Sequence, residues 1–547
     1  MSQHRRPPSR RSGRAERNVR RRALIIGAAV VAFGVGVGVW ASGDGGGGSA
    51  ASPAATTGTS PRPSPPPSPT RTYPLSAAPL TIPAVRGHTP ARGPGWQPRK
   101  TYRVVVSDAE LGDEGRLLAG ELGLEYAGED RDVRAGDVRL ALNGDEGADP
   151  ESYSMTVRDG RVTISGPAEE GVFYGTRTLK QEVRGGRGAP EGVVRDEPAK
   201  PVRGFMLDIA RKHFTAGWIE DRVRELGDLK FNQLGLHFSD DQAFRIESDT
   251  HPEIVSAEHL TKAQVRRIVD LAASRHITVV PEIDSPGHLG AVLAAHPELQ
   301  LKNASGVPTR GAVDISDPDA AELVDDLLGE YAELFPGGPW HLGGDEYAAL
   351  FASDPEASYP QLAAAAREAH GSGAGVADLA TSWLDDRADT VRALGRTPRA
   401  WNDGFYRDTE VVPDKEIQVA YWTGKEIGAR KPAEYLAAGR KVVNYNDEFL
   451  YYVLGEPQTF VYPTGERIYG QWTPRVLRGT DAVPARYDAQ ILGGSFAVWC
   501  DLAGSQTQDQ VAAGIRMPLR ATVQKLWDPD RPALTWSEFR ALADRLG

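Results

Sequence analysis

Eight short apolar runs recur from about residue 201 onward, and each ends in polar or aromatic residues. In order, they are GFMLDIAR from Gly204, FNQLGLHFSDD from Phe231, ITVVPEIDSPGH from Ile277, WHLGGDE from Trp340, TPRAWNDG from Thr397, EIQVAYW from Glu416, KVVNYND from Lys441 and GGSFAVWCD from Gly493. Helix-period segments separate several of them, at 259–275, 320–335 and 376–395. Buried strands alternating with helices predict an α/β fold, a (β/α)8 TIM barrel. An open doubly wound sheet is the alternative, because the runs are unevenly spaced.

The barrel interpretation places function at the carboxyl ends of the strands, because active sites of this fold lie on that face. Eleven candidate residues lie at or just past the end of a run: Arg211, Asp240, Asp284, His288, Asp345, Glu346, Trp401, Trp422, Tyr451, Trp499 and Asp501. Acids and tryptophans on one rim favour a sugar site. Sugar C–H faces pack on aromatic rings, and cleavage of a glycosidic bond needs a proton donor and a stabiliser of positive charge.

Asp345 and Glu346 are neighbours directly after two glycines. Adjacent residues on an extended chain point to opposite sides. We therefore expect that the two carboxylates do not flank one bond as acid and nucleophile, and that each serves a different part of the sugar.

The amino-terminal part differs in composition from the rest. Residues 1–22 are rich in arginine, and an uncharged stretch follows at 23–41. This pattern predicts an export signal peptide or an uncleaved membrane anchor, and hence a secreted or cell-surface protein. Residues 42–74 are rich in Gly, Ser and Pro and predict a linker.

Residues 75–200 predict a small α+β domain with no reactive cluster. Four strand-like runs begin at Thr101, Asp137, Ser152 and Arg161, and Asp159-Gly160 is a hairpin signal between the last two. A helix is expected from Gly171 to Val183. Residues 201–547 are then the catalytic domain.

Charge and composition exclude several function classes. The formal net charge of −11 argues against a nucleic-acid partner. Cys500 is the single cysteine, so no internal disulfide forms, and we expect it to be a buried apolar residue. The sequence has no His-Glu-x-x-His zinc motif and no P-loop, and we expect no cofactor and no metal. The oligomeric state is left open.

Five of the runs, in order, resemble the glycoside hydrolase family 20 β-N-acetylhexosaminidases: RGFMLDIARKHF, LHFSDDQAFRIE, VVPEIDSPGH, WHLGGDE and LGGSFAVWCD. The resemblance spans roughly residues 201–530, and the preceding region looks like the family's small amino-terminal domain. It implies an enzyme that releases terminal β-linked GlcNAc or GalNAc, for example from chitin fragments, and the amino-terminal segment predicts that this enzyme is exported. The implied mechanism is retaining and substrate-assisted, through an oxazolinium intermediate.

The resemblance also implies a role for each candidate. Glu346 would be the general acid and then the general base, and Asp345 would hold the acetamido N–H. Tyr451 would aim the acetamido oxygen, while His288 and Asp240 would form a relay behind Glu346 that suits its pKa to acid work. The implied substrate-binding residues are Arg211, Trp401, Trp422, Trp499, Asp501 and Asp284.

Three departures from the family pattern affect specificity. Lys212 is inserted after Arg211, Val453 stands where the family has an acid, and Asp501 stands where the family has Glu. The last two changes predict weaker discrimination between gluco and galacto substrates. The Trp-x-Asp ending also resembles the lacto-N-biosidase branch, which releases a disaccharide. A non-catalytic glycan-binding protein is the alternative of another class.

Overall fold

Eight parallel strands form a closed barrel in the computed structural model, which describes residues 72–547 except 130–131, 145–146, 426–429 and 531. The strands are β8 (Val202–Asp208), β9 (Gln233–His237), β10 (Thr278–Glu282), β13 (Pro339–His341), β14 (Thr397–Trp401), β15 (Gln418–Tyr421), β16 (Val442–Asn444) and β18 (Ile491–Trp499). Neighbours pair in chain order, and β18 pairs with both β8 and β16. The barrel is confirmed, and the open-sheet alternative is wrong.

The barrel helices begin where the sequence places capping residues. Thr261 and Gln264 form a capping box at α4 (Lys262–Ala273), and the Thr215 side chain accepts a hydrogen bond from Trp218 N at α3 (Ala216–Asp228). Further helices of this part of the chain include α6 (Pro318–Ala332), α8 (Pro360–His370), α9 (Val376–Ala393), α10 (Pro432–Ala437), α11 (Gly465–Gln471), α12 (Gln508–Trp527) and α13 (Trp536–Leu546). Apolar faces of these helices join the strands in one large hydrophobic core. The three helical segments expected from periodicity correspond to α4, α6 and α9.

Two features of this region were not predicted. The short strand β17 (Tyr451–Val453) pairs in parallel with the last three residues of β18. Tyr451 therefore begins a strand of its own, instead of following the end of the seventh run. The second feature is a small hairpin of β11 (Gln300–Lys302) and β12 (Pro308–Val313), between α5 (Gly290–Ala295) and α6.

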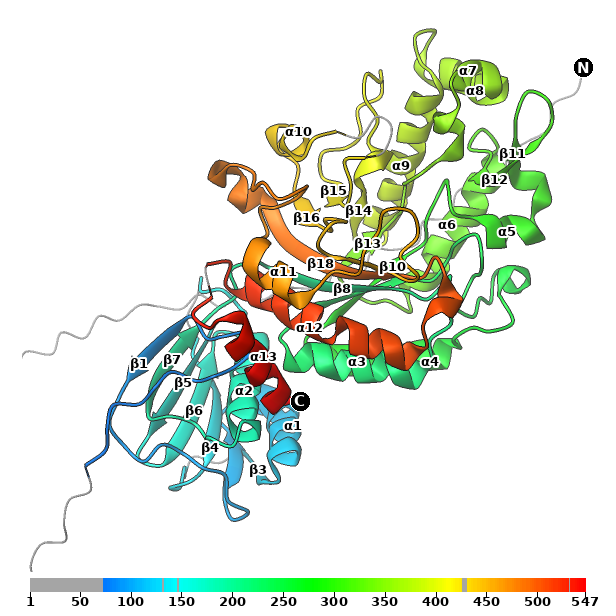
Figure 1. Cartoon of the computed structure of the whole chain (residues 1–547). Helices are drawn as coiled ribbons and strands as arrows, with labels where there is room; N and C mark the ends of the chain where they lie inside the picture. The colour runs from blue at the N-terminus through cyan, green and yellow to red at the C-terminus, as the bar shows by residue number, and fades with distance from the viewer. Residues whose placement is uncertain (1–71, 130–131, 145–146, 426–429, 531) are drawn as a thin grey trace, which may run out of the picture. The chain divides into compact units, whose positions relative to one another are not determined.

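A seven-stranded mixed sheet precedes the barrel (Figure 1). In spatial order its strands are β1 (Gly87–Pro90), β7 (Gly192–Asp196), β5 (Tyr153–Arg158), β6 (Arg161–Gly166), β4 (Val138–Leu142), β2 (Arg103–Val106) and β3 (Glu125–Glu129). Two adjacent helices, α1 (Gly112–Leu122) and α2 (Glu169–Arg184), pack on it. Asp159 and Gly160 both have positive φ, as a type I′ hairpin turn requires. β1, β3 and β7 were not among the predicted strands; β1 and β3 are edge strands that alternate weakly, whereas β7 lies inside the sheet and alternates.

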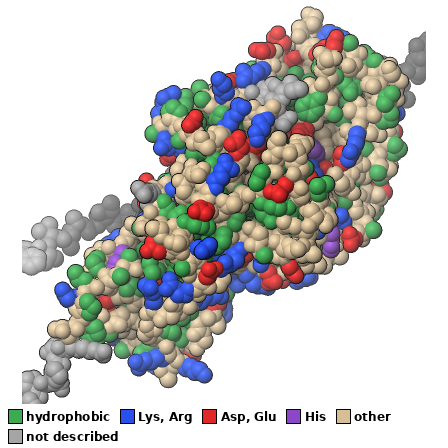
Figure 2. Space-filling model, in the orientation of Figure 1, with side chains coloured by type: hydrophobic (Ala, Val, Ile, Leu, Met, Phe, Trp, Pro, Cys, Tyr) green, Lys and Arg blue, Asp and Glu red, His purple; other side chains and the backbone are tan. Residues whose placement is uncertain are grey.

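The predicted signal or anchor at 23–41 and nearly all of the linker at 42–74 lie outside the described residues. Within the described part of the chain, the helices are too short or too polar to cross a bilayer. The sheet of the small domain ends at Asp196 and the barrel begins at Val202. On the face drawn in Figure 2, basic and acidic side chains are interspersed.

Candidate active site

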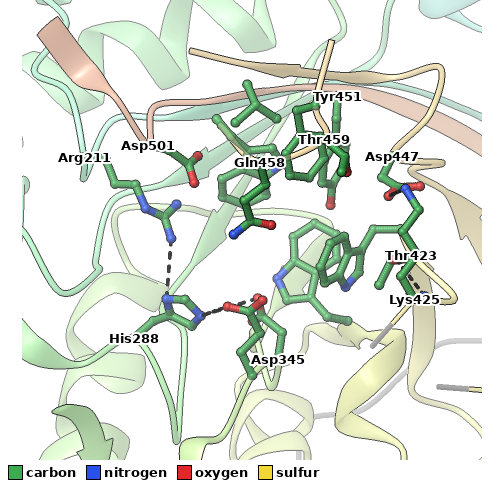
Figure 3. Close-up of a pocket in the computed structure, with 16 residues that line it drawn as sticks. Arg211, His288, Asp345, Thr423, Lys425, Asp447, Tyr451, Gln458, Thr459 and Asp501 are labelled. Atoms are coloured by element: carbon green, nitrogen blue, oxygen red, sulfur yellow. Dashed lines mark hydrogen bonds and ion pairs between the residues drawn. The ribbon is translucent and has the colours of Figure 1, made fainter. Parts of the chain in front are cut away.

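A cavity of about 280 Å³ opens at the carboxyl ends of the barrel strands (Figure 3). All the residues predicted for the site line it, except Asp240 and Asp284. Its lining residues are Arg211, His288, Asp345, Glu346, Trp401, Trp422, Thr423, Lys425, Asp447, Tyr451, Val453, Gln458, Thr459, Phe460, Trp499 and Asp501. The structure thus gathers residues from most of the eight runs into one pocket.

The turn after β13 presents the two adjacent carboxylates. Gly343 has φ +68° and Gly344 has φ +93°, and a Cβ on Gly343 would lie 1.7 Å from Asp284 Oδ1. Only glycine fits there, and Gly344 N donates to Asp284 Oδ1 at 2.9 Å. Glu346 itself has φ +49°, a costly conformation for a non-glycine residue that is typical of functional sites.

His288 contacts both carboxylates (Figure 3). Its Nε2 lies 3.6 Å from Asp345 Oδ2 and 3.4 Å from Glu346 Oε2. Two adjacent side chains therefore approach the same nitrogen. The expectation that they point to opposite sides is wrong, because it assumed an extended chain and the left-handed backbone of Glu346 breaks that alternation.

The other nitrogen of His288 faces an ion-paired network. His288 Nδ1 lies 3.4 Å from Asp240 Oδ1, and Arg211 Nη2 lies 2.6 Å from Asp240 Oδ2. Burial opposes ionisation of Asp240, but His288, His237 and Arg211 hold its pKa well below the usual value. Although burial disfavours the imidazolium, the Asp345, Asp240 and Asp284 carboxylates raise the pKa of His288 well above its ordinary value. A charged His288 between Asp240 and Glu346 has the geometry expected of a relay.

Asp284 lies behind Asp345 instead of in the cavity wall. It is fully buried, and burial with the nearby Glu282 charge raises its pKa to about 6. Burial and the charge of Asp284 likewise raise the pKa of Asp345 well above the ordinary value. The assignment of Asp284 to substrate binding is thus corrected: its contacts are with Gly344 N and Asp345, so it is a positioning residue.

The structure lowers the pKa of Glu346, and the contact with His288 is the main cause. The relay of His288 and Asp240 was expected to adjust the pKa of Glu346 for general-acid catalysis, which requires protonated Glu346. The raised pKa of His288 and the lowered pKa of Glu346 instead favour the proton on the imidazole, whose Nε2 is 3.4 Å from Glu346 Oε2. The pair therefore holds the proton that an acid step needs, one short transfer away from Glu346.

Aromatic side chains wall the pocket. Tyr451 stacks on Trp422 with ring centroids 5.8 Å apart and planes 4° apart, and it also contacts Trp499 at 5.8 Å. Trp401 Nε1 donates to Glu282 Oε1 at 2.8 Å, which fixes the buried ring. The hydroxyl of Tyr452 bonds Gln506 outside the cavity, so Tyr451 is the tyrosine of this site.

Arg211 keeps its contacts despite the inserted Lys212. It pairs with Asp208 and Asp240, while Lys212 Nζ donates to Ala503 O at 2.8 Å. Lys212 therefore binds a partner that Arg211 does not use. Asp501 lines the cavity near Arg211 (Figure 3), and Val453 adds an apolar patch where the family pattern has an acid.

Several pocket residues were missed by sequence reasoning. Asp447 ends the run KVVNYND and forms an ion pair with Lys425 at 2.6 Å, and Gln458, Thr459 and Phe460 follow β17. The position of Asp447 at the end of a strand run was a usable signal. The others lie in loops, where residue type alone gave no indication.

Two acids outside the cavity lining, the half-buried Asp403 and the fully buried Glu282, support the wall. Asp403 accepts from Trp422 Nε1 at 2.8 Å and from Glu346 N at 3.2 Å. Glu282 lies between His237 and His341, whose Nδ1 atoms are 3.1 Å and 3.2 Å from its carboxylate. A charged residue inside an apolar strand, as in VVPEID, is the signal that could have revealed Glu282.

The two parts of the chain that match known protein families correspond to its two large sheets. The catalytic domain of glycosyl hydrolase family 20 matches residues 201–521, and domain 2 of that family matches residues 78–197. The chain belongs to glycosyl hydrolase family 20. A Bifidobacterium bifidum lacto-N-biosidase is 29% identical over 479 residues, which cover 86% of this chain and 42% of that protein. A Porphyromonas gingivalis beta-hexosaminidase is 33% identical over 36% of this chain and 29% of its own.

The chain thus spans less than half the length of these two curated relatives. Among solved structures, the GH20 beta-N-acetylhexosaminidase from Streptomyces coelicolor A3(2) superposes with a TM-score of 0.68, at 23% identity over 86% of this chain and 96% of that one. At this identity the similarity supports the shared fold alone.

Proposed function

We propose that this chain hydrolyses terminal β-linked N-acetylhexosaminides with retention, the substrate's own acetamido oxygen acting as nucleophile. The observation that carries the proposal is the convergence of Asp345 and Glu346 on one nitrogen of His288, at 3.6 Å and 3.4 Å, on the floor of an aromatic pocket. Two carboxylates this close to one atom are not arranged to attack opposite faces of a sugar ring, whereas a substrate-assisted reaction needs one acid and one acetamido holder.

The first step uses one proton and one pair of electrons. Glu346, protonated from His288, donates to the glycosidic oxygen as the bond from that oxygen to C1 breaks. The acetamido oxygen bonds to C1 and gives a cationic bicyclic intermediate, while Asp345 accepts the acetamido N–H. The Tyr451 hydroxyl donates a hydrogen bond to the acetamido oxygen and aims it.

The second step restores the acetamido group. Glu346 removes a proton from water, the water oxygen bonds to C1 on the face that the leaving group occupied, and the bond from C1 to the acetamido oxygen breaks. The sugar is released with its original anomeric configuration, and Glu346 is again protonated. In its ionised form, which the positive charge of the intermediate favours over the protonated one, Asp345 stabilises that charge in both directions.

A disaccharide-releasing specificity is the second candidate, and two observations favour it. The match to the Bifidobacterium bifidum lacto-N-biosidase covers 86% of this chain. The pocket also extends past the aromatic wall to Lys425, Asp447, Gln458 and Thr459, which offer hydrogen-bonding groups for a second sugar. For a disaccharide-releasing enzyme, Val453 and Asp501 would leave space in the cavity for the second sugar, which larger acidic side chains at these positions would fill.

One assay separates the candidates. Chromogenic β-glycosides of GlcNAc, GalNAc and lacto-N-biose are offered to the wild type and to Glu346→Gln. Release of chromophore from any of them by the wild type, with loss in the variant and inhibition by a thiazoline mimic of the bicyclic intermediate, supports the proposal. Preference for lacto-N-biose selects the second candidate. If the wild type released chromophore from none of the three glycosides, a non-catalytic glycan-binding protein would be favoured. If it hydrolysed a β-glucoside without the N-acyl group equally fast, substrate assistance would be contradicted.

We also propose that the protein works outside the cytoplasm, on glycan ends such as chitin fragments. The support is the arginine-rich segment followed by the uncharged stretch at 23–41, which suits either an export signal or an anchor. Fractionation of cells that express the full chain tests this: we expect activity in the medium or on the cell surface, and activity confined to the cytosol would contradict the proposal.

A further inference from the structure

Two loops at the rim of the barrel bring a second cluster of ligand-type residues together, apart from the cavity. His251 directly precedes the short helix Pro252–Ile254, which follows β9, and Glu253 lies in that helix. His296 lies directly after α5, which follows β10. Glu253 Oε1 is 3.0 Å from His251 Nδ1 and 2.9 Å from His296 Nε2. One carboxylate oxygen therefore contacts a nitrogen of each histidine.

The remaining nitrogen of each ring also faces a carboxylate. His251 Nε2 is 3.7 Å from Asp326 Oδ2, and His296 Nδ1 is 3.3 Å from Glu298 Oε1. His251 Nε2 is buried and makes no hydrogen bond to any described residue. Each histidine is thus placed between an inner acid, Glu253, and an outer acid.

Neutral imidazole rings without a cation between them satisfy this arrangement poorly. A neutral imidazole has one N–H, so it can donate to only one of its two carboxylates and turns a lone pair toward the other. If instead the inner nitrogens bind a cation through their lone pairs, each neutral ring can donate its single N–H to its outer acid. A ligating histidine that donates its other N–H to a carboxylate is the usual second shell of a protein zinc site.

We propose that His251 Nδ1, Glu253 Oε1 and His296 Nε2 bind one divalent transition-metal ion of the zinc class. Two histidines and a carboxylate are borderline ligands that suit Zn²⁺. The observed spacings of 2.9 Å and 3.0 Å approach the ~3.3 Å edge of a tetrahedron with bonds of about 2.0 Å. Water would complete the coordination, since the Glu253 side chain is 43% exposed.

The position of the site gives it a structural role. Asp240 begins the loop that carries His251, and His288 lies two residues before α5, which leads to His296. The metal would tie together the two loops that hold the Asp240–His288 pair. Sequence reasoning expected no metal, because these ligands are far apart in the chain and match no zinc motif.

Metal binding to the full chain, stripped with a chelator and desalted, tests the proposal. Titration with ZnCl2 in a calorimeter should show one equivalent bound by the wild type. His296→Gln and Glu253→Gln should each weaken that binding at least tenfold, and Asp326→Asn about tenfold through the outer shell. His370→Gln, at the carboxyl end of the helix Pro360–His370, which supplies none of the proposed ligands, is the control and should leave binding unchanged.

Spectroscopy identifies the ligands independently. Co²⁺ in place of Zn²⁺ should give a tetrahedral absorption spectrum that His296→Gln abolishes, and Zn²⁺ should raise the Tm of the wild type but not of that variant. Zinc binding of unchanged affinity in His296→Gln would place the ion elsewhere, for example on the acids beside His288, and would overturn the proposal. Absence of zinc binding by the wild type would overturn it as well.

Discussion

At the scale of single residues, the adjacent Tyr451 and Tyr452 offer a test of the mechanism, with Tyr452 as the control for Tyr451. Tyr451 lines the cavity, whereas the hydroxyl of Tyr452 bonds Gln506 elsewhere. Tyr451→Phe removes one donor aimed at the acetamido oxygen, so we expect kcat on a GlcNAc glycoside to fall 10²–10³-fold. Tyr452→Phe should change kcat less than twofold and stability by about 1 kcal/mol. Steady-state kinetics and thermal unfolding measure both variants, and equal kcat values for the two would remove Tyr451 from the mechanism.

His288 sets the pH range in which the acid step works. The wild-type pair with Glu346 keeps its proton up to the raised pKa of His288. In His288→Gln the proton is held by Glu346 alone. Loss of the His288 contact raises the pKa of Glu346, but a carboxyl group ordinarily titrates below an imidazolium, so the basic limb of kcat/KM should still move to lower pH. The pH profile of kcat/KM measures the shift. A basic limb at the wild-type position would show that His288 does not hold this proton.

Residue-level prediction from sequence succeeded where a residue ends a strand run. Asp345, Glu346 and the three tryptophans follow buried strands, and barrel geometry alone brings such positions together. Thr459 and Gln458 come from a loop whose path depends on tertiary packing, so no local pattern announced them. Asp284 was misassigned because a strand-end position does not tell whether a side chain faces the cavity or the turn behind it.

At the scale of elements, the turn after β13 is the structure on which the site depends, and its two glycines differ. A Cβ on Gly343 would overlap Asp284, whereas the nearest atom to a Cβ on Gly344 is 3.9 Å away. Gly344→Ala meets only an unfavourable φ and should cost about 1–2 kcal/mol of stability.

Gly343→Ala meets the same conformational cost and must also displace Asp284. We expect a larger loss of stability and a fall in kcat of at least tenfold, because Asp284 supports both Gly344 and Asp345. Denaturant unfolding and kinetics on the two variants make the comparison. Equal effects of the two substitutions would contradict the steric argument.

The same contrast explains which elements sequence could predict. β8 is buried along its whole length, and its central residues 204–207 read as an apolar run. β17 has three residues and owes its existence to pairing with the end of β18, a contact that no local pattern encodes.

At the scale of the whole molecule, buried ion pairs join the small domain to the barrel. Arg203 of β8 has a fully buried side chain and contacts Glu151 Oε1 at 2.7 Å, and Lys230 pairs with Asp196 at 3.3 Å. These four charged residues lie in or near strands of the two domains, but which of them pair across the two sheets depends on how the domains pack. The sequence therefore predicted two domains without indicating what holds them together.

Breaking one buried pair should destabilise both domains together. Arg203→Met leaves Glu151, whose side chain is only 15% exposed, without its cation, so we expect the free energy of unfolding to fall by about 3–5 kcal/mol. Arg184→Met is the control: Arg184 is half exposed and 3.3 Å from Asp228, and its loss should cost less than about 1 kcal/mol. Adding Glu151→Leu to Arg203→Met removes the uncompensated charge and should recover part of the loss. Urea unfolding of the four proteins gives the values. If the double variant were no more stable than Arg203→Met, lost packing of the arginine on Tyr174 and Trp527, instead of an unpaired buried charge, would be the cause.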